Sequence, residues 1–169
     1  FRHQTRGGHR THLHFEAVDY ECTVYVNGKK IGSHKGSSDP FTFDITDALH
    51  PGDNELTVSV VDQTAPSQTL GKQTLQPKGI YYTRVSGIWQ TVWLEDVPER
   101  HFHMVKMKPR IAEGTLRVLP TLEGEPLKLE RIVVTVRDGD RVVGVADAAL
   151  SVRIPNAKLW SPRSPSLYD

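Results

Sequence analysis

Short rows of alternating hydrophobic and polar residues run through the chain, and no stretch keeps an apolar period of 3.6 residues. Alternation with a period of two predicts strands that bury one face. In the first part of the chain such rows predict strands over residues 12–18, 22–26, 41–45, 56–60 and 88–95. In the last of these, Trp89 and Trp93 fall on one face, where we expect them to stack and cover a large apolar area.

Turn residues punctuate these rows. Asn27-Gly28 is the strongest short hairpin signal, because both residues tolerate the positive φ of a tight turn. Residues 51–54 (Pro-Gly-Asp-Asn) predict a second turn. From 63 to 79 the apolar rhythm stops, which predicts a long loop. Pro98, followed by two charged residues, is the predicted domain boundary.

Beyond that boundary the pattern of short strands resumes. Strands are predicted over residues 102–108, 115–119, 132–137, 141–145 and 149–154. Asp138-Gly139 predicts a hairpin between two of them. Evenly spaced short strands separated by turns are typical of antiparallel sandwiches. The fold class is therefore all-β, with one sandwich over 1–98 and a second over 99–169.

Composition narrows the possible functions. The 169 residues include 21 Lys and Arg against 20 Asp and Glu, which predicts no basic stripe for nucleic acid. No apolar run is long enough for a membrane span, so no membrane partner is expected. Cys22 is the only cysteine, which excludes an internal disulfide and a multi-cysteine metal site. The cellular compartment stays open between cytoplasmic and periplasmic or secreted.

Candidate catalytic and metal-binding residues are sparse. His9, His12 and His14 form an H-x-x-H-x-H cluster, and a strand would place the last two on one face, where they could share a metal ion. The alternative, which we favour, is the outward polar face of a half-buried strand. Glu16 and Glu95 are interpreted as solvated strand residues, and no pair of carboxylates that could act together as acid, base or nucleophile can be placed in a cleft. We predict no catalytic residue, no metal and no cofactor.

Several segments in order resemble glycoside hydrolase family 2, the family of β-galactosidases, β-glucuronidases and β-mannosidases. They are LHFEAVDY at 13–20, VYVNG at 24–28, GSHKG at 32–36, PFTFDIT at 40–46, SGIWQTVWLE at 86–95, NAKLWSP at 156–162 and LY at 167–168. The resemblance implies a galactose-binding-like jelly-roll domain, incomplete at its N-terminus, followed by an immunoglobulin-like domain that lacks its last strand.

The resemblance also implies a function. The family's catalytic barrel, with its pair of glutamates, would follow residue 169 in the same protein. This chain would then be the non-catalytic N-terminal region of a retaining β-galactosidase or β-glucuronidase-type enzyme, inactive alone, that supports the barrel and meets carbohydrate with it. A homo-oligomer is compatible with the resemblance, and the sugar that is cleaved stays open. The alternatives are a free-standing carbohydrate-binding or adhesion module, and a structural spacer.

The loop over 64–84 is the candidate binding region, since the corresponding family region lies near the barrel mouth. Aromatic faces stack on sugars, and polar side chains bind their hydroxyls. The residues predicted to contact substrate are Lys72, Gln73, Tyr81, Tyr82 and Arg84. The competing interpretation is that both tyrosines close the sandwich core beneath the loop or contact a neighbouring domain. Trp160 is interpreted as an anchor against a neighbouring domain rather than a sugar platform.

Overall fold

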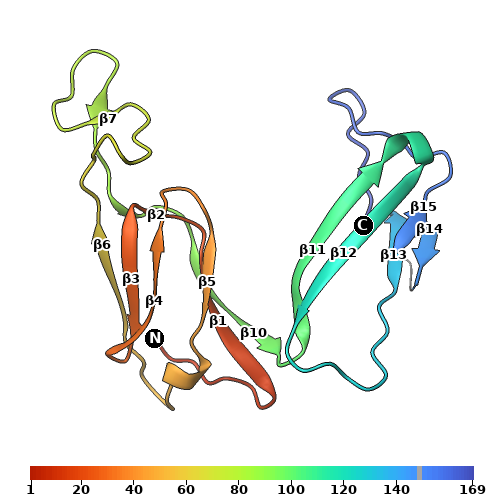
Figure 1. Cartoon of the computed structure of the whole chain (residues 1–169), viewed down its shortest axis with the longest axis horizontal. Coiled ribbons are helices and arrows are strands. Elements are labelled where there is room, and N and C mark those ends of the chain that lie inside the picture. The colour runs from red at the N-terminus through yellow and green to blue at the C-terminus, as the bar shows by residue number, and fades with distance from the viewer. Residues whose placement is uncertain (148–149) are drawn as a thin grey trace. The chain divides into compact units, whose positions relative to one another are not determined.

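A computed structural model describes residues 1–147 and 150–169. The chain divides into two compact units, Phe1–Pro98 and Glu99–Asp169, each described here by itself (Figure 1). Within the described residues the helical elements are two 3-10 turns, η1 (Thr46–Ala48) and η2 (Ile111–Glu113). The prediction of an all-β chain is therefore confirmed. None of the described helices is long and apolar enough to cross a membrane.

Unit 1 is built from two facing antiparallel sheets and two small strand pairs. One sheet has the order β10-β1-β5 and the other β4-β3-β6, while β2 pairs with β9 and β7 with β8 (Figure 1). The strands are β1 (His9–Phe15), β2 (Val18–Asp19), β3 (Glu21–Val26), β4 (Lys29–Lys35), β5 (Phe41–Asp44), β6 (Leu56–Val61), β7 (Gln73–Thr74), β8 (Tyr82–Thr83), β9 (Gly87–Ile88) and β10 (Val92–Pro98).

The core of unit 1 lies between these sheets. Alternate residues of β1 and β3 point inward, and the buried cluster consists of Leu13, Phe15, Val18, Cys22, Val24, Val26 and Ile45. Gly32 on β4 faces the Phe43 ring of β5, and a Cβ atom at Gly32 would clash with that ring. Only glycine therefore allows the two sheets to approach at this point.

The predicted hairpin at Asn27-Gly28 is confirmed, and it also carries a side-chain network. Asn27 and Gly28 adopt φ values of 51° and 76°. The Asn27 amide donates 2.8 Å hydrogen bonds to the Ala48 carbonyl and to Asn54 Oδ1, and its own Oδ1 accepts from the Glu55 N–H at 2.8 Å. Asn54 is buried. The hairpin turn is thus joined to the turn that precedes β6.

The predicted strand over 88–95 is wrong, because the chain bends between Ile88 and Val92 and forms β9 and β10 instead. The bend separates the two tryptophans that were expected to stack. Trp89 donates from Nε1 to the Ser37 carbonyl at 2.7 Å, whereas Trp93 donates to Glu16 Oε1 at 2.9 Å. Both remain exposed.

The histidine row of β1 lies on the outer face of its sheet, as the alternation predicts. His14 stacks on Trp93 with a centroid distance of 3.9 Å, and its Nδ1 lies 2.9 Å from the Thr42 hydroxyl. The His14 and Glu95 side chains approach to 3.3 Å. His12 meets His14 edge-on at 6.1 Å. In the part of the chain that the structure describes, no three His, Cys, Asp or Glu side chains gather as metal ligands would.

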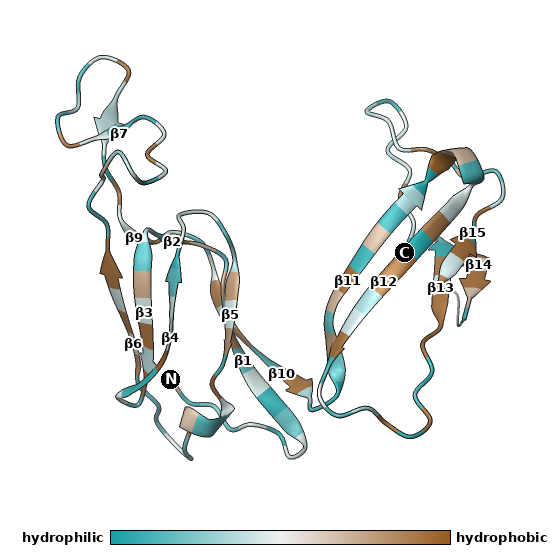
Figure 2. Ribbon diagram, viewed as in Figure 1, coloured by the Kyte–Doolittle hydropathy of each residue, from teal (hydrophilic) through white to brown (hydrophobic). Residues whose placement is uncertain are grey.

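Unit 2 contains two antiparallel sheets, β11-β12-β15 and β13-β14. Its strands are β11 (His101–Arg110), β12 (Thr115–Glu123), β13 (Val134–Asp138), β14 (Arg141–Ala146) and β15 (Ser151–Arg153). Each corresponds to a predicted strand, although residue 149, the predicted start of the last one, lies outside the described residues. The predicted hairpin forms between β13 and β14, with Asp138 opposite Arg141. Hydrophobic and hydrophilic bands alternate along β11 and β12 (Figure 2).

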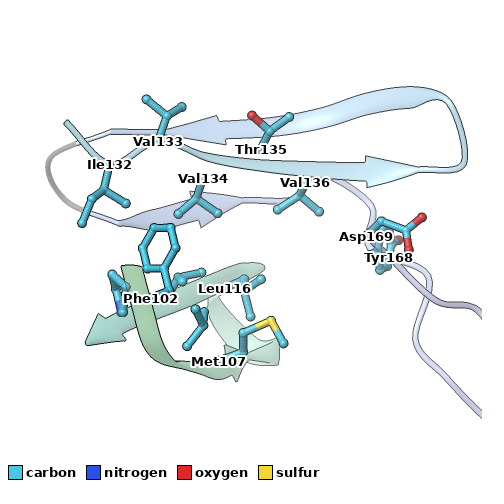
Figure 3. A pocket seen from close by; sticks show the side chains of 13 residues that line it. Phe102, Met107, Leu116, Ile132, Val133, Val134, Thr135, Val136, Tyr168 and Asp169 are labelled. Atoms are coloured by element: carbon cyan, nitrogen blue, oxygen red, sulfur yellow. The ribbon is translucent and has the colours of Figure 1, made fainter. Parts of the chain in front are cut away.

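An apolar slot separates the two sheets of unit 2. Val134 and Val136 point across it toward Phe102, Met107 and Leu116, and the hollow that remains has a volume of about 300 Å³ (Figure 3). Among the described residues of unit 2, the buried apolar side chains are Val118, Val136 and Val152. Unit 2 therefore buries less of its apolar surface than unit 1 does.

Candidate functional site

A hollow of about 310 Å³ opens at one end of unit 1, between Asp19 of β2 and residues of the long loop after β6. The side chains that define it come from the β2 strand, the turn after β4 and the loop after β6. They include Asp19, Ser37, Leu70, Gln73, Tyr82 and Trp89. The predicted loop over 63–79 is thus one wall of a concave site.

Two short strand pairs place these residues. Asp19 lies opposite Gly87 in the β2–β9 pair, so its backbone is fixed to the sandwich. Gly87 has a φ of 107°, a conformation that side chains other than hydrogen rarely allow. Gln73 lies opposite Tyr82 in the parallel β7–β8 pair, which closes the loop on itself.

Asp19 is the buried carboxylate of the hollow, with 8% of its surface exposed. Burial raises the pKa of Asp19, because the charged form loses solvation. A hydrogen bond from the Gln73 side chain lowers this pKa, and the negative charge of Asp62 raises it. The balance leaves the pKa of Asp19 above its ordinary value. Such a carboxylate gains most from a ligand that donates hydrogen bonds to it.

Asp62 organises the loop around the hollow. Its Oδ1 accepts hydrogen bonds from the Thr64 N–H at 2.9 Å and the Gln68 amide at 3.0 Å, and its Oδ2 accepts from the Ser86 hydroxyl at 2.7 Å. Burial raises the pKa of Asp62, but these three donors, with the nearby charge of Arg84, outweigh it and lower the pKa overall. Because both oxygens are engaged, Asp62 serves as a structural acceptor rather than a free acid or base.

Aromatic rings flank the buried carboxylate. Trp89 is 55% exposed and Tyr82 is 51% exposed, although Trp89 is held in place by its hydrogen bond to Ser37. An exposed ring whose orientation is fixed offers a flat surface to the C–H face of a sugar at little entropic cost. The Gln73 side chain is fixed as well, since its Oε1 accepts from the Val85 N–H at 2.7 Å.

The structure brings together two of the five residues predicted to contact substrate. Gln73 and Tyr82 line the hollow. Lys72, Tyr81 and Arg84 are exposed residues of the same loop that do not line it. Both tyrosines are exposed, which contradicts the alternative that they close the core.

Sequence reasoning missed Asp19, Asp62 and Trp89. Asp19 and Trp89 were noticed only as parts of longer motifs, and Asp62 directly follows a strand without any motif of its own. In the sequence the signal for Asp19 is only that it directly follows the apolar residue Val18. Their strand has two residues, too few to show the alternation that predicts a strand.

The arrangement is suited to binding a polyol. One buried carboxylate accepts hydrogen bonds from hydroxyl groups, an amide side chain lies beside it, and rings flank the opening. Hydrolysis of a glycoside by two carboxyl groups needs both of them free to exchange protons or to attack. Asp62 is engaged by three donors, so the pair Asp19 and Asp62 does not supply that machinery.

Comparison with known proteins assigns unit 1 to a family of domains. The family model described as "Glycosyl hydrolases family 2, sugar binding domain" matches residues 3–98. A putative β-glucuronidase of Formosa agariphila is 30% identical over 168 residues, covering 92% of this chain and 20% of the relative. A β-galactosidase of Thermoanaerobacter pseudethanolicus is 28% identical over 180 residues, covering 96% and 23%. The chain spans about a fifth of the length of these relatives.

Solved structures give the same result for the fold. An FMN-binding β-glucuronidase from Faecalibacterium prausnitzii L2-6 superposes with a TM-score of 0.79 at 28% identity, over 99% of this chain and 28% of that one. Another β-glucuronidase from Faecalibacterium prausnitzii superposes with a TM-score of 0.76 at 25% identity, over 96% and 32%. The predicted jelly-roll sandwich in the first part of the chain is confirmed by these matches.

Proposed function

The chain belongs to glycoside hydrolase family 2, whose sugar-binding domain it contains, and on this premise we propose that unit 1 holds a sugar ring in the hollow around Asp19. The parent protein would be a retaining glycosidase of the β-galactosidase or β-glucuronidase type. In it this chain is the non-catalytic region, and a barrel domain in the same polypeptide supplies the catalytic glutamates.

One observation carries the proposal for the hollow. Asp19 is a buried carboxylate whose pKa is raised, in a concavity flanked by exposed rings. Burying the charge of Asp19 is costly even with the hydrogen bond from Gln73, because its pKa stays above the ordinary value. Two hydroxyl groups of a sugar, donating to its oxygens, would offset part of that cost. The residues proposed to contact the sugar are Asp19, Gln73, Tyr82 and Trp89, with Lys72, Tyr81 and Arg84 at the outer part of the loop.

We propose that unit 2 is the immunoglobulin-like domain of the parent enzyme. Two antiparallel sheets of short strands face one another across an apolar slot, as in a small sandwich. Trp160 is 60% exposed in unit 2, and an exposed tryptophan two residues before Pro162 suits an anchor against a neighbouring domain.

A free-standing carbohydrate-binding module is the second candidate. It is supported by the fact that the side chains defining the hollow all belong to unit 1. A hollow that is complete within one domain can bind sugar without a partner. The affinity of the isolated chain separates the two proposals, because a site that needs the barrel binds weakly without it.

The binding proposal can be tested on the chain as it is. Calorimetric titration with methyl glycosides of galactose, glucuronic acid and mannose should show weak binding of one of them, with Kd above about 1 mM. Trp89→Ala should abolish the signal, whereas Trp93→Ala removes an exposed tryptophan outside the hollow and should leave it unchanged. An equal loss of the binding signal in the two variants would refute the assignment of the hollow as the sugar site. Binding tighter than about 0.1 mM would favour the free-standing module.

Activity assays test the parent enzyme separately. The isolated chain should hydrolyse no nitrophenyl glycoside. In the parent protein, Asp19→Ala should lower kcat/KM, whereas the matched change Asp53→Ala, at an exposed turn of the same unit, should not. Turnover by the isolated chain would show that the chemistry had been assigned to the wrong domain.

A further inference from the structure

The strand register of unit 2 gathers basic side chains on one face of the β11-β12-β15 sheet. Lys108 lies opposite Arg117, and Arg117 lies opposite Ser151 on the neighbouring strand. In the next row Arg110, Thr115 and Arg153 are neighbours, and Lys106 lies one row further along β11. The residues between them along each strand, such as Met107 and Leu116, line the apolar slot instead. Lys106, Lys108, Arg117 and Arg153 therefore define an outward basic face.

These four cations have no carboxylate partner. In the described part of the chain, no ion pair involves Lys106, Lys108, Arg117 or Arg153. Other cations of unit 2 do have partners. Arg110 pairs with Glu113 at 3.1 Å, and Lys158 pairs with Asp138 at 2.6 Å. All four residues of the basic face are exposed.

This clustering has an energetic cost. Like charges directly opposite one another in an antiparallel pair are destabilising, and Lys108 and Arg117 occupy such a position. Side chains on one face repeat at roughly 7 Å along a strand and about 5 Å between strands, so the four charges lie within a compact array. A bound polyanion would relieve their mutual repulsion.

The basic face could not be expected from the net charge of the chain. A net charge of +1 predicts no basic stripe, whereas the register of three strands places four cations on one face. Net charge reports only the sum, and many acids of the chain lie in unit 1 or in ion pairs of unit 2.

We propose that this basic face binds a carboxylated polysaccharide, a chain of uronic acid residues, and so holds polymeric substrate on unit 2. Arginine and lysine bind carboxylates through charge-assisted hydrogen bonds, and a row of cations matches a polymer with regularly repeated carboxylates. The choice of a polysaccharide rests on the function proposed above, whereas the charge array itself does not. Solved β-glucuronidases are among the structures that the chain resembles.

The test measures binding of the 169-residue chain to immobilised polygalacturonate by biolayer interferometry in 50 mM NaCl. The face variant combines Lys108→Gln, Arg117→Gln and Arg153→Gln. Its matched control combines Lys128→Gln, Arg141→Gln and Arg163→Gln, which removes the same charge from exposed, unpaired positions of unit 2 outside the face. Melting curves check that both variants are folded.

We expect the face variant to bind about tenfold more weakly and the control to change by less than about twofold. Binding should weaken in 500 mM NaCl, and carboxyl-reduced polygalacturonate should not bind. Equal loss in both variants, or binding of the reduced polymer, would overturn the proposal. So would tighter binding of single-stranded DNA or phosphatidylserine vesicles than of polygalacturonate. The face variant should still bind the methyl glycoside in the hollow, so this failure is distinguishable from that of the proposed function.

Discussion

Replacing Asn27 by glycine would measure what its side-chain network contributes to unit 1. The backbone at this position has a φ of 51°, which glycine adopts without strain. The substitution therefore keeps the hairpin and removes the side chain. It deletes the hydrogen bonds to the Ala48 carbonyl and Asn54 Oδ1, and it leaves the Glu55 N–H without its acceptor.

The expected loss follows from three hydrogen bonds of 2.8 Å in a partly buried place. Each contributes about 1 kcal/mol net, and water can replace part of the bonding at the rim, so Asn27→Gly should cost about 2–3 kcal/mol. Asn27→Ala should cost about 1 kcal/mol more, because alanine is disfavoured at positive φ. The difference between the two variants isolates the backbone contribution from the hydrogen bonds.

Urea unfolding followed by tryptophan fluorescence can measure these losses. A Trp160→Phe background restricts the signal to the two tryptophans of unit 1. Asn156→Gly is the matched control, since Asn156 has a φ of 52° but its side chain makes no hydrogen bond within the described residues. The control should stay within about 0.5 kcal/mol of wild type in a melt of the full chain. If Asn27→Gly were equally neutral, the network would contribute nothing and the reasoning would be refuted.

Three further substitutions probe the hollow and the core. Asp19→Asn should raise the melting temperature at neutral pH and raise it less in acid. Burial raises the pKa of Asp19, so the charged form that predominates as pH rises costs stability, and asparagine removes that cost. Calorimetric melts from pH 4 to 8 with no such trend would contradict this. Asp62→Asn should destabilise at neutral pH and progressively less as pH falls below about 4, because hydrogen bonds hold the pKa of Asp62 low. Melts of this variant therefore extend down to about pH 2, and a loss that stays constant over the whole range would be inconsistent with the assignment. Gly32→Ala should lower the free energy of unfolding in urea by about 1–3 kcal/mol, because the added Cβ meets the Phe43 ring. Lys30→Ala on the same strand, an exposed position, should be nearly neutral. Equal losses in the two variants would argue against the clash.

Much of unit 1 could be predicted from the sequence because its signals are local. Alternation over six or seven residues specifies a half-buried strand, and β1 and β3 both carry it. Asn27-Gly28 specifies its own turn because both residues tolerate the positive φ that the turn requires. Asp44 accepts a hydrogen bond from the Thr46 N–H, two residues further along the chain, at 2.9 Å. These predictions needed no knowledge of partners distant in the chain.

The hollow could not be predicted in the same way, because its parts meet only through long-range pairing. Asp19 and Gly87 lie opposite each other in strands of two residues, too short for any period to show. Trp89 was assigned to a continuous strand with Trp93, and nothing local indicated that the backbone would bend after Ile88. Its hydrogen bond to Ser37 joins residues 52 positions apart.

The hollow combines a carboxylate attached to the core with walls formed by the loop. Asp19 is fixed by β2 to the buried core beside Val18, so the group proposed to accept hydrogen bonds from the ligand's hydroxyls is attached to the core of unit 1. The walls depend instead on the hydrogen bonds that Asp62 and Gln73 accept within the loop, with few buried apolar contacts behind them. Segments of that kind open at lower free energy than the core does. Affinity is therefore expected to depend on the fixed carboxylate, whereas selectivity among sugars should depend on loop residues such as Tyr82. Changes at Asp19 should then weaken every glycoside alike, while changes at Tyr82 should alter their ranking.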